Sequence, residues 1–337
     1  MEKSAISAAP SLSDKIEEPP AGEPRAAHRE KPSMPIPAAF AGRLALPAIV
    51  SPMFLISGPA LVTACCKAGL VGTFPALNQR TTEGYEAWLD EIEGALAPTD
   101  APYGVNLIVH GSNTRLKADL EVTVRRRVPL VITSLGAVKD VVDAVHSYGG
   151  LVFHDVINRR HAEKAAQAGV DGIIAVSAGA GGHAGTMSPF ALVSEIRQVF
   201  SGTVILAGSM STGAHVAAAR AMGADLAYMG TRFIATEESL ADRGFKEMIV
   251  ASSAADILYT PAISGVNANF LIPSIKAAGL DPKNLPAHGK MDMGSEAKAW
   301  KTVWSAGQGV GAITDAPSVA DLVARMKAEY EAAKQAL

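Results

Sequence analysis

From about residue 44 onward, the chain alternates between short apolar runs and longer stretches with the mixed polar and apolar pattern of a helix. The apolar runs have about five to seven residues and are rich in β-branched side chains. Uninterrupted runs of this kind are typical of parallel strands that are buried on both faces. We predict eight strands, at residues 46–51, 70–75, 103–109, 129–134, 151–156, 172–177, 203–208 and 226–231.

The segments between the runs carry helix boundaries. The sequences CCKAGL, HSYGGL, AAQAGV and RAMGAD each place a glycine where a left-handed residue closes a helix. Ser57 and Ser188 are predicted helix caps, since each is followed closely by a proline, Pro59 and Pro189. Each predicted strand is therefore followed by a predicted helix.

Eight strand–helix units in series indicate an α/β fold, a (β/α)8 TIM barrel with a small C-terminal cap segment. An open doubly wound sheet is the alternative, but the units show no clear halving point. We expect a disordered tail at 1–38, the barrel at 39–240, a cap over the barrel mouth at 241–292, and C-terminal helices that complete the barrel at 293–337.

The composition excludes several classes of partner. A net charge of -3 over 337 residues gives no electrostatic reason to expect nucleic acid or an anionic membrane.

Cys65 and Cys66 are neighbours on a predicted helix, so we interpret them as core residues in a reducing compartment. We expect no signal peptide, a cytoplasmic location and no membrane span. A homodimer is compatible with the sequence.

Active sites of such barrels lie at the strand ends and in the loops that follow them. The loops after the seventh and eighth strands often bind phosphate, because free backbone N–H groups favour an anion. We therefore expect a phosphate cradle at Gly208, Ser209, Gly230 and Thr231. The alternative is that these glycines only shape turns.

The segment SAGAGGHAGT after the sixth strand places His183 among four glycines. A dinucleotide turn is disfavoured, since the next helix begins only near Ser188. We interpret the glycines as clearance for a ligand and His183 as the proton-transfer group. The alternative is a histidine that only hydrogen-bonds its own loop.

His154, which ends the fifth strand toward the mouth, is the second candidate. Lys139 and Asp155 could orient a ligand. Neither a metal motif nor a serine-nucleophile elbow is present in the sequence.

The segments SAGAGGHAG, GVDGII, ADLAYMGTRFIAT and WSAGQGVGAI, together, resemble the nitronate monooxygenases, formerly called 2-nitropropane dioxygenases. The resemblance covers about residue 44 to the end. It implies an FMN-dependent oxidoreductase that converts alkyl nitronates and O2 into a carbonyl compound and nitrite, without a metal. His183 would be the catalytic base. The implied cofactor contacts are Pro52, Met53, Asn106, Gly181, Gly182, Gly208, Ser209, Gly230, Thr231 and Gln308, with Gly307 beside the last.

The chain departs from the usual pattern of this family at two positions. Relatives commonly carry an acidic residue where this chain has Gly179, and a second glycine where it has Ser209. His154 and Ser305 are candidate substrate contacts. An NAD(P)H-dependent FMN reductase of quinones or enoyl thioesters, and a flavin-binding protein without turnover, remain alternatives.

Overall fold

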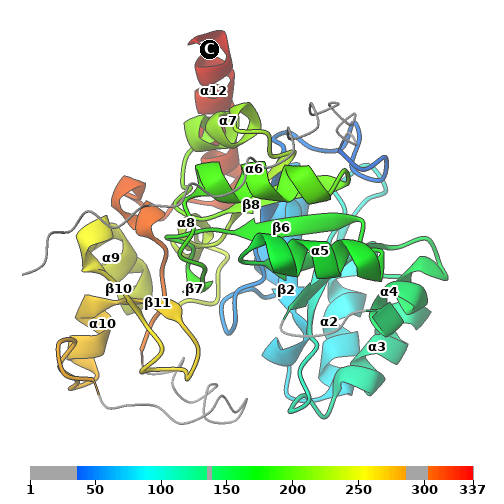
Figure 1. The fold of residues 1–337 in the computed structure, drawn as a ribbon, viewed down its shortest axis with the longest axis horizontal. Coiled ribbons are helices and arrows are strands. Elements are labelled where there is room, and N and C mark those ends of the chain that lie inside the picture. Colours follow the sequence, from blue (N-terminus) through cyan, green and yellow to red (C-terminus); the bar gives the residue numbers. More distant parts are fainter. Residues whose placement is uncertain (1–35, 135–138, 286–302, 337) are drawn as a thin grey trace, which may run out of the picture. The chain divides into compact units, whose positions relative to one another are not determined.

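In a computed structural model that describes residues 36–134, 139–285 and 303–336, eight parallel strands close into a barrel in chain order (Figure 1). The last strand pairs with the first, Ala48 lying opposite Ala227, so the sheet is closed rather than open. The barrel strands are β1 (Ala48–Val50), β2 (Val71–Pro75), β3 (Gly104–Ile108), β4 (Leu130–Ser134), β5 (Leu151–Val156), β6 (Gly172–Val176), β8 (Thr203–Ala207) and β9 (Leu226–Met229). The TIM-barrel prediction is confirmed.

A helix follows each barrel strand. These helices are α1 (Pro59–Lys67), α2 (Thr82–Ala95), α3 (Leu116–Arg125), α4 (Lys139–His146), α5 (Arg159–Ala168), α6 (Pro189–Val199), α7 (Gly213–Ala221) and the short α8 (Thr231–Ile234). The predicted glycine closures are confirmed by positive φ angles at Gly69, Gly149, Gly169 and Gly223.

The helix starts differ in part from the prediction. Pro59 and Pro189 do begin α1 and α6. However, the N-cap of α1 is Gly58, and the Ser57 hydroxyl instead accepts from the N–H of Met53 at 3.0 Å. Ser188 occupies the N-cap of α6, but its side chain makes no capping hydrogen bond.

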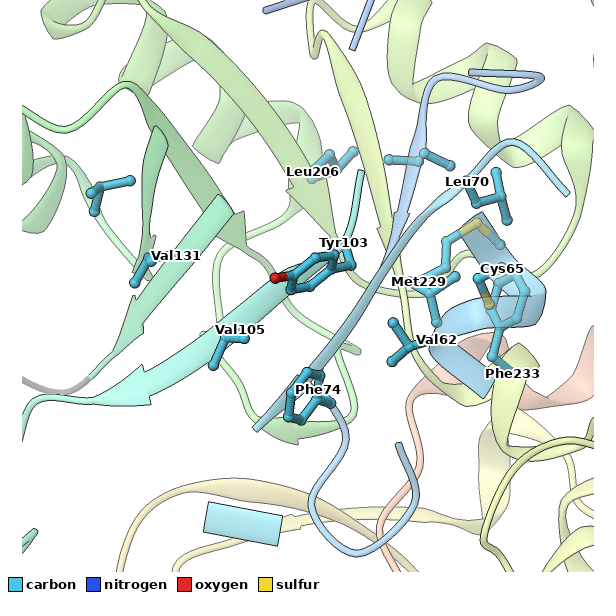
Figure 2. Packing of buried hydrophobic residues seen from close by; sticks show 14 of the residues in the cluster. Val62, Cys65, Leu70, Phe74, Tyr103, Val105, Val131, Leu206, Met229 and Phe233 are labelled. Carbon is cyan, nitrogen blue, oxygen red and sulfur yellow. The ribbon is translucent and has the colours of Figure 1, made fainter. Parts of the chain in front are cut away.

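Two apolar cores result from the alternation of side chains along the strands. One cluster fills the barrel and includes Ile49, Leu130 and Phe153, and Phe40 meets the Phe153 ring edge to face at 6.1 Å. The larger cluster lies between strands and helices. Figure 2 shows part of it, with Val62, Cys65, Leu70, Phe74, Tyr103, Val105, Val131, Leu206, Met229 and Phe233.

Both cysteines are free and buried in the outer core. Ile36, inside the predicted tail, packs against the barrel-filling cluster. Residues 1–35 of that tail lie outside the described residues.

Beyond the barrel, the described chain forms α9 (Arg243–Ala251), β10 (Ile257–Thr260), β11 (Ala268–Leu271) and α10 (Ile272–Ala277). They lie together, next to β7 (Gly182–His183), in Figure 1. β10, β11 and β7 form an antiparallel sheet that the sequence pattern did not predict.

The C-terminal segments were predicted as helices, and this is partly wrong. Residues 286–302 lie outside the described residues, and residues 303–307 are not helical; a 3-10 turn follows at Gln308–Ala312. The last helix, α12 (Val319–Ala336), is present and packs on α7 (Figure 1), where a Cβ on Gly213 would overlap the carbonyl of Met326. No helix of the described chain has the length and apolarity needed to cross a membrane.

Candidate active site

A cavity of about 1510 Å³ opens at the carboxyl ends of the barrel strands. Every barrel strand contributes to its wall directly or through the loop that follows. The wall also includes residues from beyond the barrel, among them Leu240, Ala241, Asp242, Phe245, Tyr259, Val266 and Asn267. The cavity therefore lies where active sites of this fold occur.

His183 reaches the cavity wall from β7. Its backbone lies opposite Ala268 of β11 in the antiparallel sheet. The Ser305 hydroxyl accepts from the N–H of Gly182 at 2.7 Å and donates to the carbonyl of Asn269 at 2.6 Å. The Asn269 amide donates to the carbonyl of Ala180 at 2.7 Å. These hydrogen bonds hold the loop at Ala180 and Gly182, just before His183.

The glycines of this loop pack against protein. A Cβ on Gly181 would lie 3.0 Å from the backbone nitrogen of Gly307 and 3.2 Å from the Thr231 hydroxyl. Gly179 has φ +79°, and a Cβ there would overlap the Ser209 hydroxyl. Clearance at these two positions is therefore required by neighbouring loops, in contrast to the expectation of ligand clearance alone.

The four residues of the predicted phosphate cradle come together. Gly208 and Ser209 follow β8, Gly230 and Thr231 follow β9, and all four line the cavity. β8 and β9 are neighbours in the sheet. The Ser209 N–H already donates to the carbonyl of Gly179 at 3.3 Å, and the Thr231 hydroxyl accepts from the N–H of Gly307 at 2.8 Å.

His154 and Asp155 lie on opposite faces of β5. Asp155 shares the interior face with Phe153, whereas His154 shares the helix-facing side with Val152 and Val156. The Nδ1 atom of His154 lies 2.8 Å from the Thr133 hydroxyl, and burial lowers the pKa of His154 to about 4. The imidazole is therefore neutral at pH 7.

Burial has the opposite consequence for Asp155, because it disfavours the charged form of either group. It raises the pKa of Asp155 to about 7, an effect that the nearby His183 partly offsets. Both residues line the cavity, but only Asp155 faces the barrel interior.

The remaining predicted site residues occupy varied positions. Pro52, Met53 and Ser305 line the cavity, as does Asn106, which is 7% exposed and donates to the carbonyl of Ile132 at 3.2 Å. Gln308 is exposed and does not belong to the lining; its backbone N–H donates to the carbonyl of Gly179 at 2.8 Å.

Sequence reasoning missed Tyr228. This residue of β9 lines the cavity, and burial raises its pKa well above the usual range, with a further contribution from Asp155. The period of two in strand β9 places Tyr228 on the same face as Leu226 of the barrel-filling cluster. This alternation of side chains along the strand is the sequence feature that could have identified Tyr228. In the parts of the chain that the structure describes, no three metal-binding side chains come together.

Comparisons with known proteins extend over most of the chain. The family model described as nitronate monooxygenase matches residues 42–329. A nitronate monooxygenase of Paraburkholderia phytofirmans is 28% identical over 284 residues, 71% of this chain and 76% of the relative.

Two further proteins are similar. The (3aS,4S,5R,7aS)-5-hydroxy-7a-methyl-1-oxo-octahydro-1H-indene-4-carboxyl-CoA dehydrogenase of Rhodococcus jostii is 28% identical over 220 residues, 65% of this chain and 61% of that protein. The solved nitroalkane oxidase of Streptomyces ansochromogenes shares the fold, with a TM-score of 0.77, 23% identity, and coverage of 89% of this chain and 99% of that one.

Proposed function

The chain belongs to the nitronate monooxygenase family, and from that premise we propose that it is an FMN-dependent oxidoreductase that uses O2 to oxidise alkyl nitronates. The products are a carbonyl compound and nitrite. The observation that carries this proposal is the placement of His183: a hydrogen-bonded loop holds it at the wall of the same cavity that the ends of β8 and β9 line.

The residues present fit FMN. At the ends of β8 and β9, Gly208 and Gly230 bring no side chain to the wall, so their backbone can approach a phosphate closely. Pro52, Met53 and the Asn106 amide supply apolar and hydrogen-bonding surface elsewhere on the same cavity. When bound, FMN supplies the electron acceptor that no side chain of this chain provides.

His183 acts as the base in this proposal. A neutral nitroalkane must lose a carbon-bound proton before it is a nitronate, and an imidazole near neutrality accepts such a proton. The pairing with β11 and the hydrogen bond from Gly182 to the Ser305 hydroxyl restrict the backbone that carries the imidazole. A base whose position is fixed before the reaction is effective, because little conformational entropy is lost when the proton is transferred.

A second candidate is reduction or dehydrogenation of a larger substrate, such as an acyl thioester. The cavity of about 1510 Å³ exceeds the roughly 300–1,000 Å³ that suits a drug-sized ligand, so it has room for FMN and a second sizeable molecule. Arg80, Arg115 and Lys164 also line it and could meet phosphate groups. The name of the Rhodococcus relative includes such a thioester.

One experiment separates these functions. The FMN-loaded protein is supplied with ethyl nitronate in air, while O2 uptake and nitrite are measured, and separately with NADH or NADPH without O2, while the flavin absorbance is followed. We expect nitronate-dependent O2 uptake with nitrite release and no bleaching by the nicotinamides. Rapid bleaching without nitronate turnover would establish the reductase instead, and no turnover under either condition would favour a flavin-binding protein.

A further inference from the structure

Asp155 is a half-buried residue whose carboxyl group the proposed proton transfer does not use. It lies on the interior face of β5, opposite Ile174 of β6, and contributes to the cavity lining. Its Oδ1 atom is closed to solvent and has no hydrogen-bond partner among the described residues. A buried polar atom without a partner is costly, so a bound molecule that supplies one gains affinity.

Two ionisable side chains from other strands interact electrostatically with this carboxyl. His183 of β7 favours its charged form, and the Asp155 charge in turn disfavours ionisation of Tyr228 of β9. Burial outweighs the effect of His183, so the pKa of Asp155 is raised to about 7. Asp155 is therefore protonated in a large fraction of molecules near neutral pH, and a protonated carboxyl can donate a hydrogen bond.

We propose that the protonated carboxyl of Asp155 donates a hydrogen bond to an oxygen of the substrate's nitro or nitronate group. The identity of that oxygen rests on the proposed function. An oxygen bearing negative charge is the best acceptor for such a donor, because charge-assisted hydrogen bonds are roughly twice as strong as neutral ones. The ionised carboxylate, in contrast, repels the same anion. Asp155 thus selects substrates that present an anionic oxygen at the interior end of the cavity.

The test uses nitrate, a planar anion with the oxygen arrangement of a nitro group, as an unreactive probe. Isothermal titration calorimetry measures its dissociation constant on the FMN-loaded protein from pH 5 to 9. Asp155→Asn keeps a hydrogen-bond donor but cannot ionise, and Asp155→Leu removes the donor. Asp140→Asn, on an exposed position of α4, removes one formal charge from a residue that does not line the cavity and is the matched control.

At pH 6, we expect Asp155→Asn to bind nitrate about as tightly as the unmodified protein, and Asp155→Leu to bind about tenfold more weakly or worse. Above pH 7, the Kd of the unmodified protein should rise relative to that of Asp155→Asn, approaching tenfold per pH unit. His183 is present in all these variants, and Asp155→Asn and Asp155→Leu both remove the Asp155 charge that acts on it, so the comparison of these two variants isolates the hydrogen-bond donor. Asp140→Asn should follow the unmodified protein.

A ratio that stays constant from pH 5 to 9, or nitrate binding by Asp155→Leu that equals Asp155→Asn at pH 6, overturns the proposal. Infrared difference spectra of the unmodified protein minus Asp155→Asn give a readout without any ligand: the protonated carboxyl band should be present at pH 6 and absent at pH 9. Absence of the band at pH 6 also overturns it. Thermal melting and FMN content show whether each variant is folded and loaded.

The outcomes distinguish this proposal from the proposed function. If the predicted nitrate profile occurs but no nitronate is oxidised, Asp155 is an anion-binding residue for a different reaction. If nitronates are oxidised with nitrite release while the nitrate ratio is flat, the proposed function holds and the role of Asp155 is wrong.

Discussion

The two ends of the barrel interior are built by the same strands from different kinds of side chain. At the amino end, Leu130 and Phe153 of the strands, together with Phe40 from the turn before β1, are completely buried and apolar, and they fill the space between the strands. At the carboxyl end, Asp155 and Tyr228 line a large cavity. Two residues of one strand, Phe153 and Asp155, belong to the two ends.

The amino end therefore contributes mainly to stability, and the carboxyl end mainly to binding and catalysis. Filling the amino end gains free energy from close packing and from the removal of apolar surface from water. Leaving the carboxyl end open gives up such packing and buries a carboxyl whose Oδ1 has no partner in the described chain. A change at the amino end should therefore alter unfolding, and a change at the carboxyl end should alter binding or turnover.

The largest effect is expected at the carboxyl end. His183→Asn removes the proposed base but keeps a side chain of similar polarity. We expect turnover of a neutral nitroalkane to fall about 10²- to 10⁴-fold. Turnover of the preformed nitronate should fall less, because its carbon-bound proton is already gone. O2 uptake with both substrates measures the two losses, and equal losses would contradict the role as base.

At the amino end, Phe153→Ala should cost about 3–5 kcal/mol of unfolding free energy, since it leaves a cavity beneath Phe40. Phe190→Ala is the control, because Phe190 is 70% exposed and should change stability by less than about 0.5 kcal/mol. Urea unfolding measures both. If Phe153→Ala lost FMN affinity without losing stability, the division between the two ends would be wrong.

The sequence predicted the strands well, because the eight runs are mostly buried and apolar. That same property concealed the direction of the side chains. Val152 and Val156 on one face of β5 are as apolar as Phe153 on the other, so no pattern showed whether His154 or Asp155 faces the interior.

The sheet of β7, β10 and β11 was hidden for another reason. β7 has only two residues, too short for any periodicity, and its partner Ala268 is distant from His183 in sequence. His183 was singled out because it is the one imidazole in the glycine-rich loop after β6, and it does line the cavity. Its attachment through Ser305 could not, since that contact exists only in the folded chain.

The two faces of β5 should respond to pH in opposite directions. The pKa of His154 is lowered from 6.5 to about 4, so its contribution to stability is complete above pH 6.5 and is lost as the pH falls toward 4. The pKa of Asp155 is raised from 3.8 to about 7, so its contribution is complete below pH 3.8 and is lost as the pH rises through 7. In the unmodified protein, the changes of these two contributions with pH largely cancel between pH 4 and 6.5.

Single variants should reveal both contributions. As the pH rises from 4 to 6.5, the unfolding free energy of His154→Gln should fall by roughly 3 kcal/mol relative to that of the unmodified protein. As the pH rises from 4 to 7, that of Asp155→Asn should increase by a similar amount relative to the unmodified protein. Urea unfolding at several pH values measures each difference. Slopes of the same sign in the two variants would contradict the opposite burial of the two charged forms.

The smallest expected effect concerns the contact between Gly179 and Ser209, the two positions where the chain departs from the usual family pattern. Gly179→Ala must adopt a left-handed φ and must also displace the Ser209 hydroxyl. We expect it to cost about 1–3 kcal/mol and to weaken FMN binding. Gly149→Ala is the matched control, since its φ of +83° is equally strained but an added Cβ meets nothing within 4 Å.

Ser209→Gly in the Gly179→Ala background should recover part of that loss, because it removes the displaced hydroxyl and suits the φ of +57° at position 209. The remaining deficit should be at least as large as that of Gly149→Ala, which has the backbone strain alone, because the added Cβ also lies 2.7 Å from the Gln308 amide oxygen. Thermal unfolding and FMN dissociation constants for both single variants and the double variant give the coupling between the positions, expected at about 0.5–3 kcal/mol. Strictly additive losses would mean that position 179, in the loop of His183, and position 209, in the turn after β8, do not interact. The predicted phosphate cradle would then tolerate changes in the loop that carries the proposed base.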